Sequence, residues 1–144
     1  MTPEELFDDC LEGTVYRDKQ VDAHGVHLTA RDVRRLDAAG RIDFGGSELA
    51  PCATQAIQPQ KAGPDDEYGW WRLEGGTYLV VFNERLKEGA PPTLLTPNAR
   101  LLSCGCSVAP LVCRPGELRS LLTVPSCGAA IKENARIALL RPLA

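Results

Sequence analysis

The sequence predicts an all-β fold, a compact barrel or sandwich preceded by one short helix. Short runs rich in β-branched and aromatic residues recur along the chain and are separated by glycine, proline and asparagine. Almost no segment repeats its apolar residues at the spacing of a helix. Short strands joined by frequent turns are typical of antiparallel barrels and sandwiches, so an all-β domain is expected.

The segment 75–84 is predicted to be the central buried strand. Its sequence, Gly-Gly-Thr-Tyr-Leu-Val-Val-Phe-Asn-Glu, suits a pleated backbone and is apolar on both faces. A glycine pair opens the segment and Asn83 closes it. The chain that follows, with its prolines and a short polar segment, is expected to build a site at the edge of the sheet.

The first residues predict the one helix. Thr2-Pro3-Glu4-Glu5 is a capping-box pattern with proline at the first helical position, and apolar residues follow at helical spacing to about Leu11. Gly13 is expected to end this helix. Residues 1–19 are therefore interpreted as an N-terminal helix and lead-in, with a brief strand at 15–17.

The next part of the chain is harder to assign. Residues 20–29 alternate apolar with polar around Gly25, which indicates a bulge or a close backbone approach. Residues 29–36 fit either a helical turn or a strand with a charged face, and residues 37–46 predict two short strands joined by glycine turns. Residues 51–68 contain three prolines and an acidic run and are expected to form an exposed loop.

The second half of the chain predicts further short strands. One Trp of the Trp70-Trp71 pair is expected in the core, and the other at a sheet edge or a subunit contact. With 144 residues, the chain 1–144 is expected to form a single domain. The predicted strands are 70–73, 94–95, 111–113, 120–124 and 135–140.

Composition narrows the choice of partners and compartment. The net charge of −3 gives no basic field for duplex nucleic acid, although a local nucleotide pocket remains possible. No apolar run approaches membrane-spanning length, and the N-terminus is acidic where a secretory leader would be basic. A cytoplasmic protein is expected, without a membrane partner, and its six cysteines are expected to be thiols.

Five segments, in order, resemble the dUTPase and dCTP deaminase superfamily. The similarity extends from Gln20 to the end of the chain. The five segments are residues 20–29, similar to the first family motif of glycine and hydrophobic-Asp-Leu; 76–84, similar to a strand ending in Asn-Glu; 97–102, where the family has Pro-Arg-Ser-Ser-Leu; 114–117, where it has Asp-Pro-Gly or Asp-Ala-Gly; and 135–140, where it has Arg-Ile-Ala-Gln-Leu. The resemblance implies a dUTPase-like distorted jelly-roll (β-clip) barrel. It also implies a homotrimer whose intersubunit pockets bind a deoxynucleoside triphosphate with Mg²⁺.

The positions that carry catalysis in the family are substituted here. Hydrolysis between phosphates needs a metal clamp, a carboxylate that activates water, and donors for the developing charge. The deaminase branch needs a glutamate that falls near Val124, where no carboxylate is present. The other substitutions are His27 for the carboxylate of the first motif, Asn98, Ala99 and Arg100 for Arg-Ser-Ser, Arg114 for aspartate, and Leu139 for the final glutamine.

The resemblance and its substitutions together predict a catalytically inactive homologue that binds a nucleotide or another protein. No catalytic residue, metal ligand or cofactor is assigned, and Mg²⁺ is expected only if the protein is active. The candidate substrate-binding residues are His27, Asn98, Arg100, Arg114, Glu117 and Arg136.

Alternatives remain open at these residues. His27 is either a general base or a packed, hydrogen-bonded side chain, and an active dUTP or dCTP hydrolase or deaminase would use it with Glu117. The arginines either converge on an anion or are solvated or paired with Glu117 and Glu133. A thiolate-zinc interaction module would use Cys104 and Cys106 with Cys113, and with or without Cys127; otherwise these cysteines fill the core beside turns.

Overall fold

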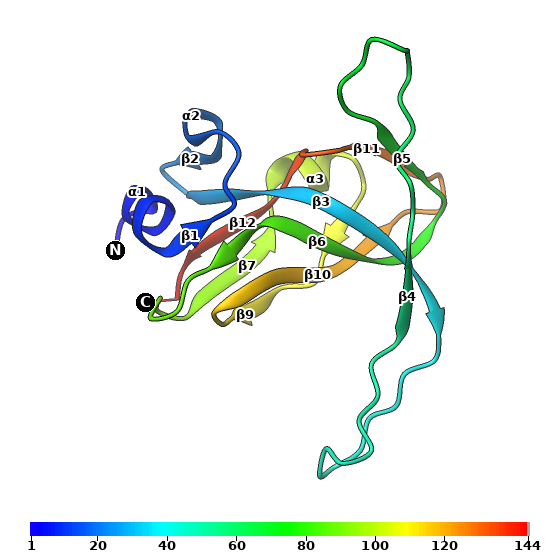
Figure 1. Cartoon of the computed structure of the whole chain (residues 1–144), viewed down its shortest axis with the longest axis horizontal. Coiled ribbons are helices and arrows are strands. Elements are labelled where there is room, and N and C mark those ends of the chain that lie inside the picture. The colour runs from blue at the N-terminus through cyan, green and yellow to red at the C-terminus, as the bar shows by residue number, and fades with distance from the viewer. Residues whose placement is uncertain (144) are drawn as a thin grey trace.

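The computed structural model describes residues 1–143 as a curled antiparallel sheet that closes into a half-barrel, with short helices at one side (Figure 1). The strand order is β8-β10-β6-β3-β12-β7-β9, and β1 pairs with β6 while β2 and β4 pair with β3. The strands of this sheet are β1 (Leu11–Glu12), β2 (Val21–Asp22), β3 (Gly25–Ala38), β4 (Ala53–Ala56), β6 (Gly76–Leu86), β7 (Thr93–Pro97), β8 (Ser107–Val108), β9 (Leu111–Cys113), β10 (Gly116–Val124) and β12 (Arg136–Pro142). A second, two-stranded sheet joins β5 (Trp70–Leu73) to β11 (Ala129–Lys132). The predicted all-β class is confirmed.

Strand β6 lies at the centre of the sheet, as predicted, because it pairs with both β3 and β10. Val80 and Phe82 are completely buried on one face, and Val81 is 3% exposed on the other. Apolar side chains on both faces require cover on both faces, which the curled sheet provides. The central strand thus organises the core around it.

The predicted capping box is present at the N-terminus. The Glu5 backbone N–H donates to Oγ1 of Thr2 at 3.1 Å, and the Thr2 backbone N–H donates to Oε2 of Glu5 at 2.9 Å. The helix α1 (Pro3–Glu5) continues as a π-helical turn (Leu6–Cys10), which buries its apolar side chains in the core.

The strand predicted at residues 15–17 is wrong. The chain instead forms the short helix α2 (Arg17–Gln20), and the backbone of Tyr16 before it is extended but unpaired with a strand. The cause is the buried side chain of Gln20, whose Oε1 accepts the backbone N–H groups of Val15 and Tyr16 at 2.8 and 2.9 Å. In a strand, these two N–H groups would instead donate to the carbonyl oxygens of a neighbouring strand.

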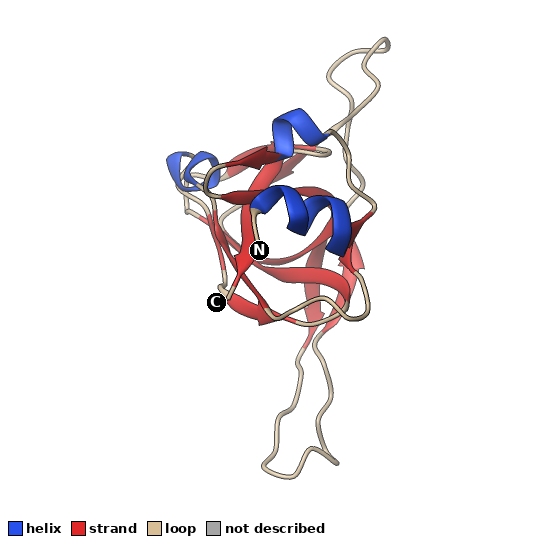
Figure 2. Ribbon diagram, turned by 90° about the vertical axis from the view of Figure 1, so that its left-hand side faces the viewer, coloured by secondary structure: helices blue, strands red, loops and turns tan. Residues whose placement is uncertain are grey.

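A long arm projects from the body between β3 and β4 (Figures 1 and 2). The undecided segment 29–36 belongs to strand β3, which continues to Ala38. The two strands predicted at 37–46 are reduced to a single bridge between Arg41 and Ala50, because beyond it no third strand supports the arm. Strand β4 lies inside the segment 51–68 that was expected to be a loop.

The arm carries large apolar side chains at its tip. Ile42 is 88% exposed, Leu49 is 57% exposed, and Phe44 is as exposed as in an extended chain. The Asp43 carboxylate shapes the tip by accepting the backbone N–H groups of Gly46 and Glu48. Nothing else in residues 1–143 covers these apolar groups.

The helix α3 (Ala99–Ser103) was not predicted, and its N-cap is Asn98. None of the helices in the described chain is long and apolar enough to cross a bilayer.

All six cysteines are free, and Cys106 and Cys113 are buried in the core. Burial raises the pKa of the Cys113 thiol to about 11, so this thiol remains protonated and unreactive.

Candidate functional site

A chain of polar side chains joins three of the predicted site residues. Nε2 of His27 lies 2.6 Å from Oδ2 of Asp22, and Nδ1 of His27 lies 3.2 Å from Nδ2 of Asn98. The same Nδ2 donates to the backbone oxygen of Arg136 at 2.9 Å. Oδ1 of Asn98 accepts the Leu101 N–H at 2.9 Å and so caps helix α3. His27 is therefore hydrogen-bonded through both ring nitrogens.

Local backbone geometry brings these residues together. Gly25 begins β3 in a positive-φ conformation, and a Cβ there would lie 2.5 Å from the backbone oxygen of Leu140. The predicted close backbone approach at Gly25 is thereby confirmed, and it lets β3 pair with β12 at His27. Asp22 lies just before Gly25 in the β2–β3 hairpin, where the two are cross-strand partners.

The Asp22 carboxylate is held in its charged form. Burial acts to raise the pKa of Asp22, but hydrogen bonds from the His27 ring and from the His24 and Gly25 backbones outweigh it. The pKa therefore lies below its ordinary value. A carboxylate with a lowered pKa is a weak base and a good partner for an imidazole N–H.

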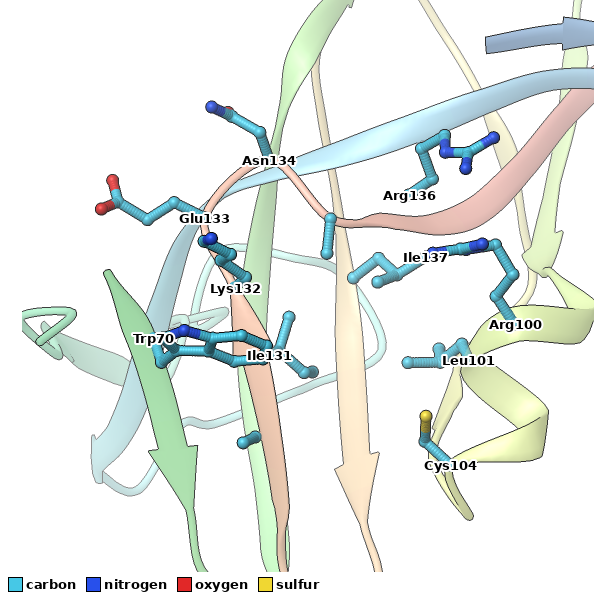
Figure 3. Close-up of a pocket in the computed structure, with 12 residues that line it drawn as sticks. Trp70, Arg100, Leu101, Cys104, Ile131, Lys132, Glu133, Asn134, Arg136 and Ile137 are labelled. Carbon is cyan, nitrogen blue, oxygen red and sulfur yellow. The ribbon is translucent and has the colours of Figure 1, made fainter. Parts of the chain in front are cut away.

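A pocket of about 430 Å³ opens beside this chain, between α3, β11 and β12 (Figure 3). Its size falls in the ordinary range for small-molecule sites. Arg100 and Arg136 lie toward one end, and Trp70 and Ile131 lie toward the other (Figure 3). Two of the predicted arginines therefore line the same pocket as the apolar side chains of Trp70 and Ile131.

The charge in the pocket is predominantly positive. It has three cationic side chains, Arg100, Lys132 and Arg136, and one carboxylate, Glu133. Arg100 forms no ion pair within the part of the chain that the structure describes. Lys132 lies over the Trp70 ring, with Nζ 5.6 Å from the ring centroid. Oε1 of Glu133 accepts the Gly69 N–H at 2.8 Å, and its one negative charge leaves the three cations in excess.

The turn that borders the pocket is held by amide groups. Asn134 has a positive φ of 65° between β11 and β12, and its Oδ1 accepts Nδ2 of Asn83 at 2.8 Å. Nδ2 of Asn83 also donates to Oγ1 of Thr29 at 2.9 Å. The prediction that Asn83 closes the central strand is wrong, because β6 continues to Leu86; its side chain instead holds the turn that follows Lys132 and Glu133.

Two predicted site residues, Arg114 and Glu117, lie elsewhere. They border a separate pocket of about 280 Å³ at the turn between β9 and β10. Glu117 accepts from Arg119 and, at 3.0 Å, from Nη2 of Arg31. The hydrogen bond from Arg119, followed by that from Arg31, lowers the pKa of Glu117 below its ordinary value. The structure therefore does not place Glu117 beside His27 within one chain.

A buried carboxylate lies behind the pocket. Glu84 is completely buried and accepts the Thr29 N–H at 2.8 Å, Oγ1 of Thr29 at 2.6 Å and Nε2 of Gln20 at 2.9 Å. Burial raises the pKa of Glu84, and the hydrogen bonds from Thr29 and Gln20 only partly oppose it. Glu84 was predicted to end its strand in a hydrogen bond to backbone. It does accept the Thr29 N–H, but strand β6 continues beyond it to Leu86.

Trp70 and Lys132 were not among the residues predicted for the site. Both lie on the small β5–β11 sheet, whose second strand has the sequence Ala-Ala-Ile-Lys. Alanine has weak strand propensity, so this strand gave no signal in the sequence. A prediction of this strand would have placed Ala130 and Lys132 on the same face of the sheet, because side chains two residues apart along a strand share a face.

The side chains of the described residues do not form a metal site by themselves. Across residues 1–143, no three His, Cys, Asp or Glu side chains are grouped to hold a metal ion. The pocket has one carboxylate, Glu133, whose Oε1 accepts a backbone N–H, so a Mg²⁺ ion there would be held mainly through the phosphates of a ligand. The thiolate-zinc alternative also lacks support, because no three cysteines are grouped within residues 1–143. What the pocket offers is cationic donors beside an apolar wall.

Comparison with known proteins points to one group of relatives. No protein-family model matches the chain. The chain is 33% identical over 134 residues to a probable deoxyuridine 5′-triphosphate nucleotidohydrolase of Methanosarcina mazei, across 88% of this chain and 74% of that protein. Proteins with the same name from Methanosarcina acetivorans and Methanosarcina barkeri are 32% and 29% identical over the same shares of each chain.

Proposed function

Because the chain belongs to the dUTPase-like superfamily, we propose that it is a nucleotide-binding homologue that does not hydrolyse its ligand. The ligand is a deoxynucleotide bound in the pocket between α3 and β12. One observation carries this proposal: the pocket presents three cations beside an apolar wall, while its carboxylate and the adjacent imidazole are engaged in hydrogen bonds within the protein.

The pocket has the chemistry that phosphates and a base require. Arg100 presents an unpaired guanidinium fork, which suits phosphate oxygens. Lys132 supplies a second positive charge next to Trp70, whose ring, together with Ile131, offers a flat apolar surface for a base. Arg136 contributes less, because its Nη1 already donates to the backbone oxygen of Lys19 at 2.7 Å.

The groups that would activate water are not free to do so. His27 would have to give up a hydrogen bond to act as a base, since Nδ1 accepts from Asn98 and Nε2 faces Asp22. Glu117 is paired with two arginines in a different pocket. Glu84 is completely buried. These contacts support a protein that holds a nucleotide without turning it over.

The proposal includes a homotrimer, the assembly that the resemblance implies. The apolar arm tip formed by Ile42, Phe44 and Leu49 supports it, because such groups are stabilised by burial against a second copy. The six free thiols support a location in the reducing cytoplasm.

The alternative function is an active hydrolase or deaminase. The names of the relatives favour it, since they are called nucleotidohydrolases. In that case a neighbouring subunit would have to supply a free carboxylate to the pocket, because the carboxylates described above are already engaged.

Calorimetric titration with dUTP and dCTP tests binding. Arg100→Ala is expected to weaken binding about tenfold or more, the usual effect of losing one charge-assisted hydrogen bond. Arg114→Ala is the matched control and is expected to leave binding unchanged, because Arg114 borders the other pocket. Equal losses in the two variants, or no binding by the unmodified protein, would contradict the proposed site.

Assays of pyrophosphate and ammonia release, with Mg²⁺ present, test the absence of turnover. The expected result is no product above a protein-free control. Turnover that disappears in Glu117→Gln would favour the active alternative instead.

A further inference from the structure

A second, smaller hollow adjoins the pocket between α3 and β12. It has a volume of about 130 Å³ and lies between β12 and helix α2 with the two residues before that helix. Asn134 and Arg136 line both the pocket and this α2 hollow. Nη1 of Arg136 donates to the backbone oxygen of Lys19 at 2.7 Å, which ties β12 to α2. The two depressions are therefore neighbours that meet at Arg136.

One wall of the α2 hollow is an exposed apolar platform. It consists of Val15 and Tyr16, whose side chains are 50% and 58% exposed. The buried Gln20 holds this platform in place, because its Oε1 accepts the backbone N–H groups of both residues at 2.8 and 2.9 Å. An aromatic ring on a backbone that is already ordered loses little further freedom when a ligand covers it. The platform is thus prepared to bind a flat group.

The α2 hollow is also positively charged. Its lining contains the cations Lys19 and Arg136 and no carboxylate. Lys19 is exposed and forms no ion pair within residues 1–143. Positive charge therefore continues from Arg100 in the pocket, through Arg136, to Lys19.

Apolar platforms lie on both sides of these cations. Trp70 and Ile131 lie toward one end of the pocket, and Arg136 lies toward the other end (Figure 3). Val15 and Tyr16 line the α2 hollow, which Arg136 separates from the pocket. Sites for short single-stranded nucleotides combine these same parts, because bases stack on aromatic rings and the phosphates between them contact cations.

We propose that the site binds two bases joined through phosphate, with the second base stacked on Tyr16 in the α2 hollow. The inference rests on the proposed function of the pocket, which holds the first base beside Trp70. The connecting phosphate lies at Arg136, whose guanidinium uses Nη1 for Lys19 and has no other partner within the described chain. Its remaining N–H groups are therefore available to phosphate oxygens.

The charge of the protein favours a short ligand over a long one. A net charge of −3 gives no basic field along which a long nucleic acid would be held. The contacts come instead from two platforms and the few cations between them. Two ligands share the required chemistry, a dinucleotide with a phosphodiester link and a dinucleoside polyphosphate.

Calorimetric titration with dUMP and with the 5′-phosphorylated dinucleotide of deoxyuridine tests the inference. The dinucleotide is expected to bind about tenfold more tightly than dUMP, the usual gain from stacking one further base. Tyr16→Ala is expected to remove this gain while the affinity for dUMP stays the same. Tyr16→Phe keeps the ring and is expected to keep the gain. Because Tyr16 is exposed, neither substitution is expected to disturb folding, and dUMP binding checks this directly.

The two ligands separate this inference from the proposed function. Equal affinities for dUMP and the dinucleotide would overturn the second base site and leave the nucleotide pocket standing. A gain that persists in Tyr16→Ala would also overturn it. If neither ligand binds, the pocket and the inference fail together.

Diuridine tetraphosphate, in its deoxy form, distinguishes the two kinds of link. If it shows the larger gain over dUMP, and the gain is lost in Tyr16→Ala, the two bases are joined through a polyphosphate. A larger gain for the dinucleotide assigns the phosphodiester link.

Discussion

At the scale of single residues, Asn98 has a structural task. It is 3% exposed and holds helix α3, strand β12 and the His27 ring through three hydrogen bonds. All the hydrogen-bonding atoms of this buried side chain have partners. Such a group stabilises the fold mainly because removing it leaves those partners without hydrogen bonds, which is costly. Its place beside the pocket was predictable from the family motif, but its role was not.

Replacing Asn98 is expected to destabilise the fold. Asn98→Ala removes the cap of α3 and leaves the backbone oxygen of Arg136 without its side-chain donor, which costs about 1–3 kcal/mol in total. Urea unfolding measures the change. Asn98→Ser restores only the cap and is expected to recover part of the loss. Unchanged stability in the alanine variant would show that the side chain is not held as described.

Glu84 is expected to make stability depend on pH. Burial raises its pKa in the folded state, so the folded protein retains a proton that the unfolded chain releases. The stabilisation from this group is complete below the pKa of the unfolded state and is lost as the pH rises through the pKa of the folded state. The free energy of unfolding is therefore expected to fall more steeply over this window than it would without Glu84.

Glu84→Gln, compared with the unmodified protein by urea unfolding at a series of pH values, measures this contribution. The difference in stability between the two is expected to shift in favour of the variant as the pH rises. Glu88→Gln, which changes an exposed glutamate, is the control and is expected to show no such trend. A difference that does not vary with pH would contradict the buried state of Glu84.

At the scale of elements, strands that are apolar on both faces were easier to predict from the sequence than elements that depend on contacts with distant residues. The central strand and the capping box were predictable because their signals are local. The end of β3 was ambiguous, since its charged face gave no periodicity and its strand state depends on pairing with β4 and β6. Helix α2 was missed because its turn depends on the buried amide of Gln20.

The arm between β3 and β4 is expected to contribute to assembly. Phe44→Asp places a charge where a second copy would cover an aromatic ring, so it is expected to weaken association at least about tenfold. Light scattering coupled to size exclusion measures the molar mass over a dilution series. Ser47→Asp adds the same charge at a polar position of the same arm and should leave the mass unchanged. A monomeric unmodified protein, or identical dilution curves for all three proteins, would contradict an assembly role.

At the scale of the whole molecule, the predicted site residues divide into two groups. Arg100 and Arg136 line the pocket beside α3, and Asn98 joins His27 to the Arg136 backbone next to it. Arg114 and Glu117 lie at the β9–β10 turn. Their order along the chain was known in advance, but their separation in space depends on how the sheet curls. The pocket is rich in cationic side chains, and the neighbouring His27, Asn98 and Glu84 are engaged in hydrogen bonds within the protein.

The most direct test of nucleotide binding without hydrolysis is ³¹P NMR of dUTP mixed with an equal amount of protein and Mg²⁺. We expect the three phosphate signals to shift or broaden through contact with the cationic pocket and then to remain unchanged over time. Growth of dUMP and pyrophosphate signals, absent from a protein-free sample, would contradict this account.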